Sequence, residues 1–215
     1  MSRLTSIVAL SALALQISAG DVTPQTSSTT APDQVEEDWK VVIGQPDPEG
    51  AGPQITVGMC PVSDDSTPSF YFNLNYRDSS SSFQAGGMQV QVCSGSTVLA
   101  DSAKGSAQCN TVGETITWTQ RMAISSGNLA FTINNGQSTT WGQFGQGQSI
   151  SVNGNFATTM SSLSGYNPST SISKSVVGWE SNRVTSMTLV QVRYYAKGQL
   201  LSTDTTPRSV DLTTN

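Results

Sequence analysis

Apolar and polar side chains alternate along much of this chain, and this period of two restricts its fold more than any other feature. Successive side chains of a strand point to opposite faces, so each alternating set marks one buried strand face. Three such sets are Ile55, Val57 and Met59; Phe70, Phe72, Leu74 and Tyr76; and Met88, Val90 and Val92. No stretch after residue 20 combines apolar residues at helical spacing with caps at both ends, so we expect very little helix.

The strongest hairpin signal lies between residues 116 and 133. Apolar residues alternate from Ile116 to Ile124 and again from Leu129 to Ile133, with Ser126-Gly127 as a turn between the two runs. Later strands are expected at Ile150 to Val152, Phe156 to Leu163, Ile172 to Val177, Val184 to Tyr195 and Gln199 to Ser202. Roughly ten short antiparallel strands are typical of an all-β, two-sheet β-sandwich of jelly-roll type. A closed barrel is the alternative.

The first twenty residues have the pattern of a signal peptide. Arg3 supplies the positive start, Ile7 to Leu15 form a short apolar run, and Ser18-Ala19-Gly20 offer a cleavage site near Gly20. Residues 21–38 are rich in Ser, Thr, Pro and acidic residues, which predicts a disordered leader or tether. A single domain is therefore expected over residues 39–215, secreted or held in the cell envelope, with no membrane span.

The charge balance of the domain argues against a nucleic-acid partner. From Ala51 onward the chain has eight acidic and eight basic residues, so it offers no basic excess to neutralise phosphates or an anionic membrane surface.

The three cysteines are an odd number for an oxidising compartment, so one disulfide and one lone thiol are the simplest expectation. Cys93 is one position out of step with the alternating apolar residues of its strand, so its side chain points to the opposite, polar face. Only a short stretch of chain separates it from Cys109. We therefore favour a Cys93–Cys109 disulfide, with Cys60 as a small buried residue.

The chain contains no histidine, which excludes Ser-His-Asp and Cys-His catalysis and histidine-ligated zinc. Enzyme hypotheses are then limited to carboxylate chemistry, of the kind that glycosidases use. Glu114 and Glu180 are the only glutamates after Ala51, and tryptophans lie near both, so they are a candidate catalytic pair. Both lie beside turns, where solvated or locally hydrogen-bonded carboxylates are ordinary. We favour this non-catalytic interpretation of the two glutamates.

Asp64 and Asp65, followed by Ser66 and Thr67, offer oxygens of the kind that calcium prefers. No EF-hand spacing accompanies them, and a turn between strands explains them equally well. No cofactor is expected, with calcium as the one candidate.

A binding module needs a few aromatic and polar side chains on a rigid scaffold. Candidates in predicted connections are the aromatics Trp141, Tyr166 and Trp179 and the polar residues Asn135, Gln143 and Arg183. Such aromatics stack on sugar rings, and the polar groups hydrogen-bond sugar hydroxyls. The alternative is that these aromatics close the ends of the core. Tyr194 and Tyr195 point to opposite faces, so at most one of the two is a surface candidate.

Four segments carry a resemblance to known sequences: residues 118–122 (WTQRM), 135–142 (NGQSTTWG), 181–184 (SNRV) and 192–195 (VRYY). Together they resemble a group of uncharacterised secreted proteins of planctomycete bacteria, over most of the domain. That resemblance implies no activity and no site residues. At the level of strand pattern alone, the chain is also similar to concanavalin-like and other jelly-roll sandwiches, which host lectins, glycosidases and structural domains alike.

The sequence thus favours a secreted or envelope-associated, non-catalytic module that binds a glycan or another extracellular partner. A carboxylate-dependent glycan-cleaving enzyme and a structural protein of a surface layer or matrix are the alternatives. The oligomeric state is left open.

Overall fold

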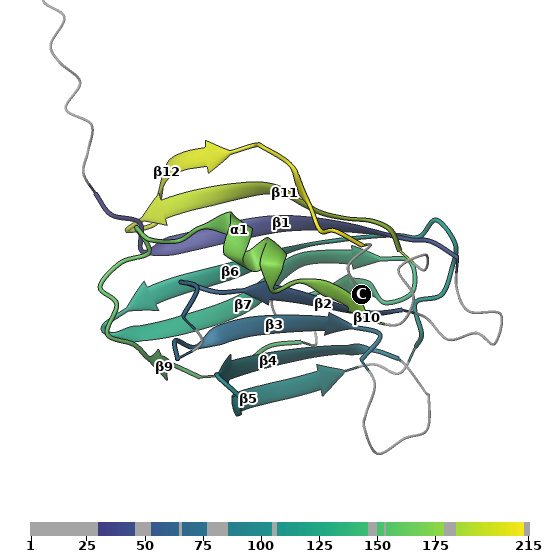
Figure 1. Ribbon diagram of the computed structural model, residues 1–215, viewed down its shortest axis with the longest axis horizontal. Coiled ribbons are helices and arrows are strands. Elements are labelled where there is room, and N and C mark those ends of the chain that lie inside the picture. Colours follow the sequence, from purple (N-terminus) through teal and green to yellow (C-terminus); the bar gives the residue numbers. More distant parts are fainter. Residues whose placement is uncertain are drawn as a thin grey trace, which may run out of the picture.

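The computed structural model describes residues 30–45, 53–64, 66–76, 86–104, 107–145, 150–152, 154–178 and 184–212. In these residues the chain forms thirteen strands and one short helix, arranged as two antiparallel sheets (Figure 1). The larger sheet, sheet A, has the strand order β12-β11-β1-β6-β7-β8, with β13 beside β11 and β9 beside β7. Sheet B has the order β10-β2-β3-β4-β5. The all-β sandwich predicted from the alternation is confirmed.

Sheet A consists of β1 (Gln34–Ile43), β6 (Thr115–Ser125), β7 (Asn128–Ser138), β8 (Gly142–Phe144), β9 (Phe156–Ala157), β11 (Val184–Ala196), β12 (Gln199–Asp204) and β13 (Arg208–Ser209). Sheet B consists of β2 (Gln54–Met59), β3 (Ser69–Leu74), β4 (Met88–Ser94), β5 (Thr97–Lys104) and β10 (Val176–Gly178). The predicted hairpin is β6–β7: Ser125 pairs with Asn128, and Ser126 and Gly127 both take positive φ, at 50° and 73°. Two such residues form the tight turn whose twist suits a two-residue hairpin.

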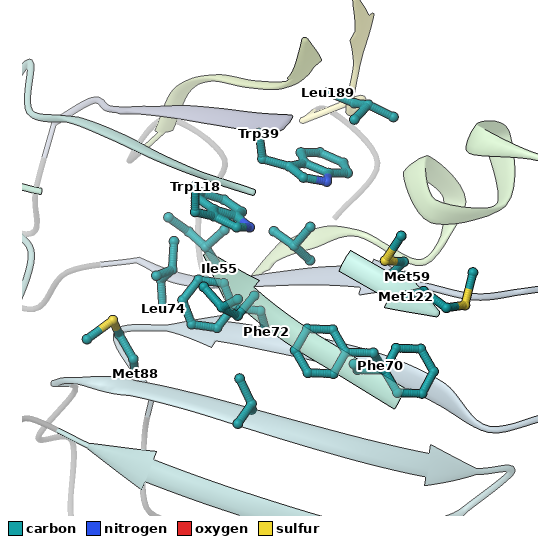
Figure 2. Packing of buried hydrophobic residues seen from close by; sticks show 14 of the residues in the cluster. Trp39, Ile55, Met59, Phe70, Phe72, Leu74, Met88, Trp118, Met122 and Leu189 are labelled. Carbon is teal, nitrogen blue, oxygen red and sulfur yellow. The ribbon is translucent and has the colours of Figure 1, made fainter. Parts of the chain in front are cut away.

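Aromatic rings join the two sheets. The Trp118 ring of β6 stacks on Trp39 of β1 with centroids 6.3 Å apart, and Phe72 of β3 meets it edge-on at 5.4 Å (Figure 2). Farther along the core, Phe70 of sheet B stacks on Phe131 of sheet A at 5.4 Å. Because the Phe72–Trp118 and Phe70–Phe131 contacts cross between the sheets, they fix how the sheets face each other.

The predicted leader extends too far toward the domain. Residues 34–38 belong to β1, which lies between β11 and β6 in the middle of sheet A. Val35, Glu37 and Trp39 of this strand are buried and alternate with more exposed residues. The strand was not predicted because the segment is acidic and because an acidic residue, Glu37, occupies a core position where an apolar residue is expected. Residues 1–29, with the predicted signal peptide, lie outside the described residues.

The chain between β9 and β10 also differs from the prediction. Residues 168–173 form α1 (Pro168–Ser173) in place of the first part of the strand expected at Ile172 to Val177. Asn167 caps this helix by accepting a hydrogen bond from the Ser169 N–H at 2.9 Å, and Pro168 follows in its first turn, where proline favours the start of a helix. The segment from Ile150 to Val152 does not form the expected strand. Of the strand expected from Phe156 to Leu163, only the first two residues form a strand, β9.

The expected Cys93–Cys109 disulfide does not form. Cys93 pairs with Ser69 at one end of β3, whereas the Cys109 backbone is held by the Asn75 side chain just past the other end, at 2.7 and 2.8 Å. At about 3.3 Å per residue these positions are roughly 20 Å apart, far beyond disulfide reach. The intervening strand β5 was not predicted, and it carries the chain back along the sheet before Cys109. Cys60 is buried, as expected.

The two thiols should react very differently in the folded protein. Burial and the neighbouring Glu114 carboxylate raise the pKa of Cys109 to about 12, and its side chain is inaccessible, whereas Cys93 is half-buried. We expect a maleimide to label Cys93 in the native state and Cys109 only after unfolding. Peptide mapping of the labelled protein checks this order, and equal labelling of both, or a Cys93–Cys109 peptide in a non-reduced digest, would contradict the structure.

Among the described residues, no helix is long and apolar enough to cross a membrane.

Candidate functional site

A band of polar side chains crosses the outer side of sheet A from β11 to β8. Core positions of β1 alternate with Glu36 and Asp38, so these two carboxylates point away from sheet B. Residues paired across an antiparallel sheet share a face, which places side chains of the neighbouring strands beside them. We call this surface the polar face; it comprises Glu36 and Asp38 of β1, Thr119 of β6, Asn135 of β7, Gln143 of β8, and Gln191, Arg193 and Tyr195 of β11.

Arg193 is the centre of the polar face. Its guanidinium binds Glu36 Oε2 through Nε and Nη2, at 3.1 and 3.0 Å. It also binds both oxygens of Asp38, with Nη2 2.8 Å from Oδ1. The three side chains are only 17 to 25% exposed, so water competes weakly for these bonds. One cation therefore holds two carboxylates on adjacent outward positions of β1.

Further hydrogen bonds extend this cluster in both directions across the sheet. Gln191 and Thr119 donate to Asp38 at 2.6 and 2.7 Å, and the Asn135 amide donates to Thr119 Oγ1 at 3.3 Å. On the other side, the Tyr195 hydroxyl donates to Glu36 at 3.2 Å. The result is a chain of hydrogen-bonded side chains from β11 across β1 and β6 to β7.

Gln143 continues the polar face on β8. It pairs with Gln137, which pairs in turn with the outward residue Thr117. Its neighbour Phe144 is buried, so Gln143 points outward and is exposed. Two of the predicted ligand-binding residues, Asn135 and Gln143, thus lie on one surface.

The electrostatics of the polar face favour binding over acid–base catalysis. Partial burial alone would raise the pKa of Asp38, but hydrogen bonds from Arg193, Gln191 and Thr119 outweigh it and hold this pKa below its ordinary value. The same bonds to Asp38 and Glu36 raise the pKa of Arg193. A general acid needs a carboxyl that keeps its proton near neutral pH, and Asp38 is held in the opposite state.

The predicted aromatic candidates are not on the polar face. The interpretation of Tyr166 as a surface residue is wrong: it is buried, and its hydroxyl is hydrogen-bonded to the carboxyl of Glu37 in the core. Trp141 is half-buried against the core, and its Nε1 donates to the Ala107 carbonyl at 2.8 Å. It therefore closes one end of the sandwich, as the alternative interpretation held. Trp179, Glu180 and Arg183 lie outside the described residues.

Glu114, one of the two candidate catalytic glutamates, is buried at the turn between β7 and β8. It is 5% exposed, and its carboxylate accepts hydrogen bonds from Ser138 Oγ at 2.6 Å, from Thr140 N at 2.8 Å and from Thr140 Oγ1 at 2.6 Å. Burial raises its pKa, but these bonds outweigh that effect and lower it. The carboxylate is thus fully used in holding the turn between β7 and β8.

The calcium candidate Asp64 takes part in a local turn. Its two carboxylate oxygens accept from Ser66 N at 2.8 Å and Ser66 Oγ at 2.6 Å, which lowers its pKa. Asp65 lies outside the described residues. Across the described part of the chain, no three Asp, Glu, His or Cys residues form a group that could hold a metal ion.

The sequence analysis missed Glu36, Asp38 and Arg193, the central residues of the polar face. The first two were assigned to the leader, so their alternation with Val35, Glu37 and Trp39 was not considered. The outward glutamate and aspartate at a spacing of two were the available signal. The pairing with Arg193, more than 150 residues away, depends on β1 lying beside β11.

A comparison with known proteins finds no matching family model, no similar curated protein and no similar solved structure.

Proposed function

We propose that the protein is an exported, non-catalytic binding module that holds an extracellular glycan on the polar face. The observation that supports this most strongly is the hydrogen-bonded series of side chains from Tyr195 and Arg193 to Asn135. Sugars present many hydroxyls that each need a donor or an acceptor. Planar carboxylate, amide and guanidinium groups held on strands supply both in fixed positions, so little side-chain entropy is lost on binding.

The size of the polar face favours an oligosaccharide over a single sugar. From β11 to β8 it crosses five strands, which at about 4.8 Å per strand gives roughly 19 Å. Tyr195 at one end offers an aromatic ring, and Asn135 and Gln143 at the other end offer amides. A ligand chain laid across the strands would contact both ends at once.

The glycosidase hypothesis has less support. Glu36 and Asp38 both bind Arg193 Nη2, at 3.0 and 2.8 Å, so their oxygens are at most about 6 Å apart, a range that includes the separation in retaining glycosidases. The guanidinium lies between them, however, and stabilises both as anions. A sugar ring would have to displace this charge-assisted network before the two carboxyls could act on it.

Binding is tested with the mature chain from Asp21 and hexasaccharides of cellulose, xylan, mannan and laminarin, in calcium and in chelator. We expect saturable binding to at least one of them. The double variant Asn135→Gly/Gln143→Ala should weaken it by about tenfold or more, because each lost ligand hydrogen bond costs about 0.5 to 1.5 kcal/mol. Glycine suits position 135, where φ is 54°.

Two control variants locate the site. Thr97→Ala changes an exposed residue of β5 on the other sheet and should leave the affinity unchanged. Trp141→Ala removes the half-buried aromatic at the end of the sandwich. Binding lost only in Trp141→Ala would move the site off the polar face. Absence of binding to every hexasaccharide would overturn the glycan proposal, and concentration-dependent self-association in the same samples would then favour a structural role.

A further inference from the structure

A carboxyl group lies inside the sandwich where the alternation of β1 should have placed an apolar residue. Glu37 is 0% exposed and occupies the core row of β1 between Val35 and Trp39. Trp39 Nε1 and Gln120 Nε2 donate to its Oε2 at 3.0 and 2.6 Å. The Tyr166 hydroxyl binds its Oε1, and Tyr166 is in turn 3.2 Å from Ser171 Oγ. The carboxyl thus joins two strands of sheet A to residues 163–175, which contain α1 and which we call the α1 segment.

The α1 segment lies beside β2 at the edge of sheet B, and Tyr166 links it to β1 of sheet A. The short strand β10 pairs only with Gln54–Thr56, and beyond it α1 takes over along β2. The Gly58 N–H donates to Ser175 Oγ at 3.0 Å, and a Cβ on Gly58 would lie 2.7 Å from Lys174 Cβ. Figure 1 shows α1 in front of the β1 region, at the upper border of sheet B. Glu37 lies beneath this segment, and Tyr166 connects the two.

The same segment forms one wall of a pocket. Leu163 and Ser164 line a pocket of about 390 Å³ together with Pro32, Tyr194 and Leu201. The Tyr194 ring lies edge-on to Tyr166 at 6.1 Å, so the position of Tyr166 affects this wall. Any change that frees Tyr166 from Glu37 would therefore alter the pocket.

In the described part of the chain, no positive charge acts on the pKa of Glu37. The groups that act on its pKa are burial, which is the largest effect and raises it, and hydrogen bonds from Tyr166, Trp39, Gln120 and Ser171, which lower it less. The titratable groups that face it are Tyr166, and Tyr194 of β11; burial raises the pKa of both, so both stay neutral. Its chain neighbours Glu36 and Asp38 point to the opposite face. The net pKa of Glu37 is above its ordinary value of 4.5.

We propose that Glu37 and Tyr166 form a proton-dependent clasp, in which the neutral carboxyl holds the α1 segment on sheet A and the ionised carboxyl releases it. In the neutral form the Oε1–H group of Glu37 donates to the Tyr166 oxygen, and Tyr166 donates its own single proton to Ser171 Oγ. Ionisation places an uncompensated charge in the core, which release of the α1 segment relieves by admitting water. The α1 segment and the pocket wall therefore loosen as the pH rises.

The sign of the linkage follows from the raised pKa. The folded state binds the Glu37 proton more tightly than the unfolded state does. This contribution to stability is complete below pH 4.5 and is lost as the pH rises through the folded-state pKa. Glu114, whose pKa is lowered, contributes in the opposite direction and loses its contribution in acid.

The test compares the full mature chain with Glu37→Gln in denaturant unfolding from pH 5 to 9. Glutamine is uncharged at every pH, so the wild-type unfolding constant should rise relative to that of the variant by up to about tenfold per pH unit within the window. Amide hydrogen exchange of residues 163–175, corrected for its intrinsic pH dependence, should accelerate over the same window in the wild type only. The matched control Glu114→Gln removes a second glutamate that is buried in the described part of the chain, and it should leave the acceleration intact.

A ratio of unfolding constants that does not change with pH would overturn the clasp, as would equal acceleration of exchange in the wild type and Glu37→Gln. If Glu37→Gln does not fold, Tyr166→Phe provides the second test. It removes the bond to Glu37 while keeping the ring, so exchange of residues 163–175 should be fast at every pH. Exchange that keeps the wild-type pH dependence in Tyr166→Phe would also overturn the proposal.

Discussion

Replacing Trp118 with alanine is expected to destabilise the folded protein by about 3 to 5 kcal/mol, the range typical of large aromatic residues removed from a core. Trp118 is 2% exposed and contacts both the Trp39 ring of its own sheet and the Phe72 ring of the other. Alanine leaves a cavity at the point where the two sheets meet. For a domain of this size, the loss corresponds to a Tm lower by about 6 to 20 °C.

Denaturant unfolding of Trp118→Ala and Trp118→Phe measures this effect. Phenylalanine keeps a ring and removes an indole N–H that has no hydrogen-bond partner in the described part of the chain, so its cost should be much smaller. Trp141→Ala, at a half-buried position, should also cost less than Trp118→Ala. Equal losses for Trp118→Ala and Trp141→Ala would mean that Trp118 does not join the sheets as described.

Replacing Gly136 with alanine is expected to displace β8 from β7, at a cost of about 1 to 3 kcal/mol or more. A Cβ at Gly136 would lie 2.1 Å from Phe144 Cδ2 and 2.3 Å from its Cε2, and the Phe144 ring is buried and cannot turn aside. Gln143 adjoins Phe144 on β8, so the displacement should also weaken hexasaccharide binding on the polar face.

The control for this variant is Gly142→Ala in the same hairpin. Nothing lies within 4 Å of a Cβ at Gly142, but its φ is +68°, so only the backbone strain of about 1 to 2 kcal/mol remains. The double variant Gly136→Ala/Phe144→Ala removes the clash and should be less destabilised than the sum of its two single variants. Strict additivity, measured by denaturant unfolding, would show that the Gly136–Phe144 contact does not limit the packing of β8.

The alternation of side chains determined the fold class, because period two is a local property of the chain. The residues from Ile116 to Ile133 could form a hairpin only about Ser126 and Gly127, and the structure has that hairpin. The sequence analysis also named Asn135 and Gln143 as candidates, and the structure places both on the outer side of sheet A; that they bind a ligand stays a prediction.

The tertiary structure decided what no local pattern contains. Glu36, Glu37 and Asp38 are three successive acidic residues, and only the position of β1 between β11 and β6 sends two of them to the polar face and one into the core. The failure of the expected disulfide has the same origin, since β5 returns the chain along the sheet before Cys109. Strand pairing brings together residues that are far apart in the sequence, and its free energy depends on packing across both sheets, so composition and spacing alone do not reveal it.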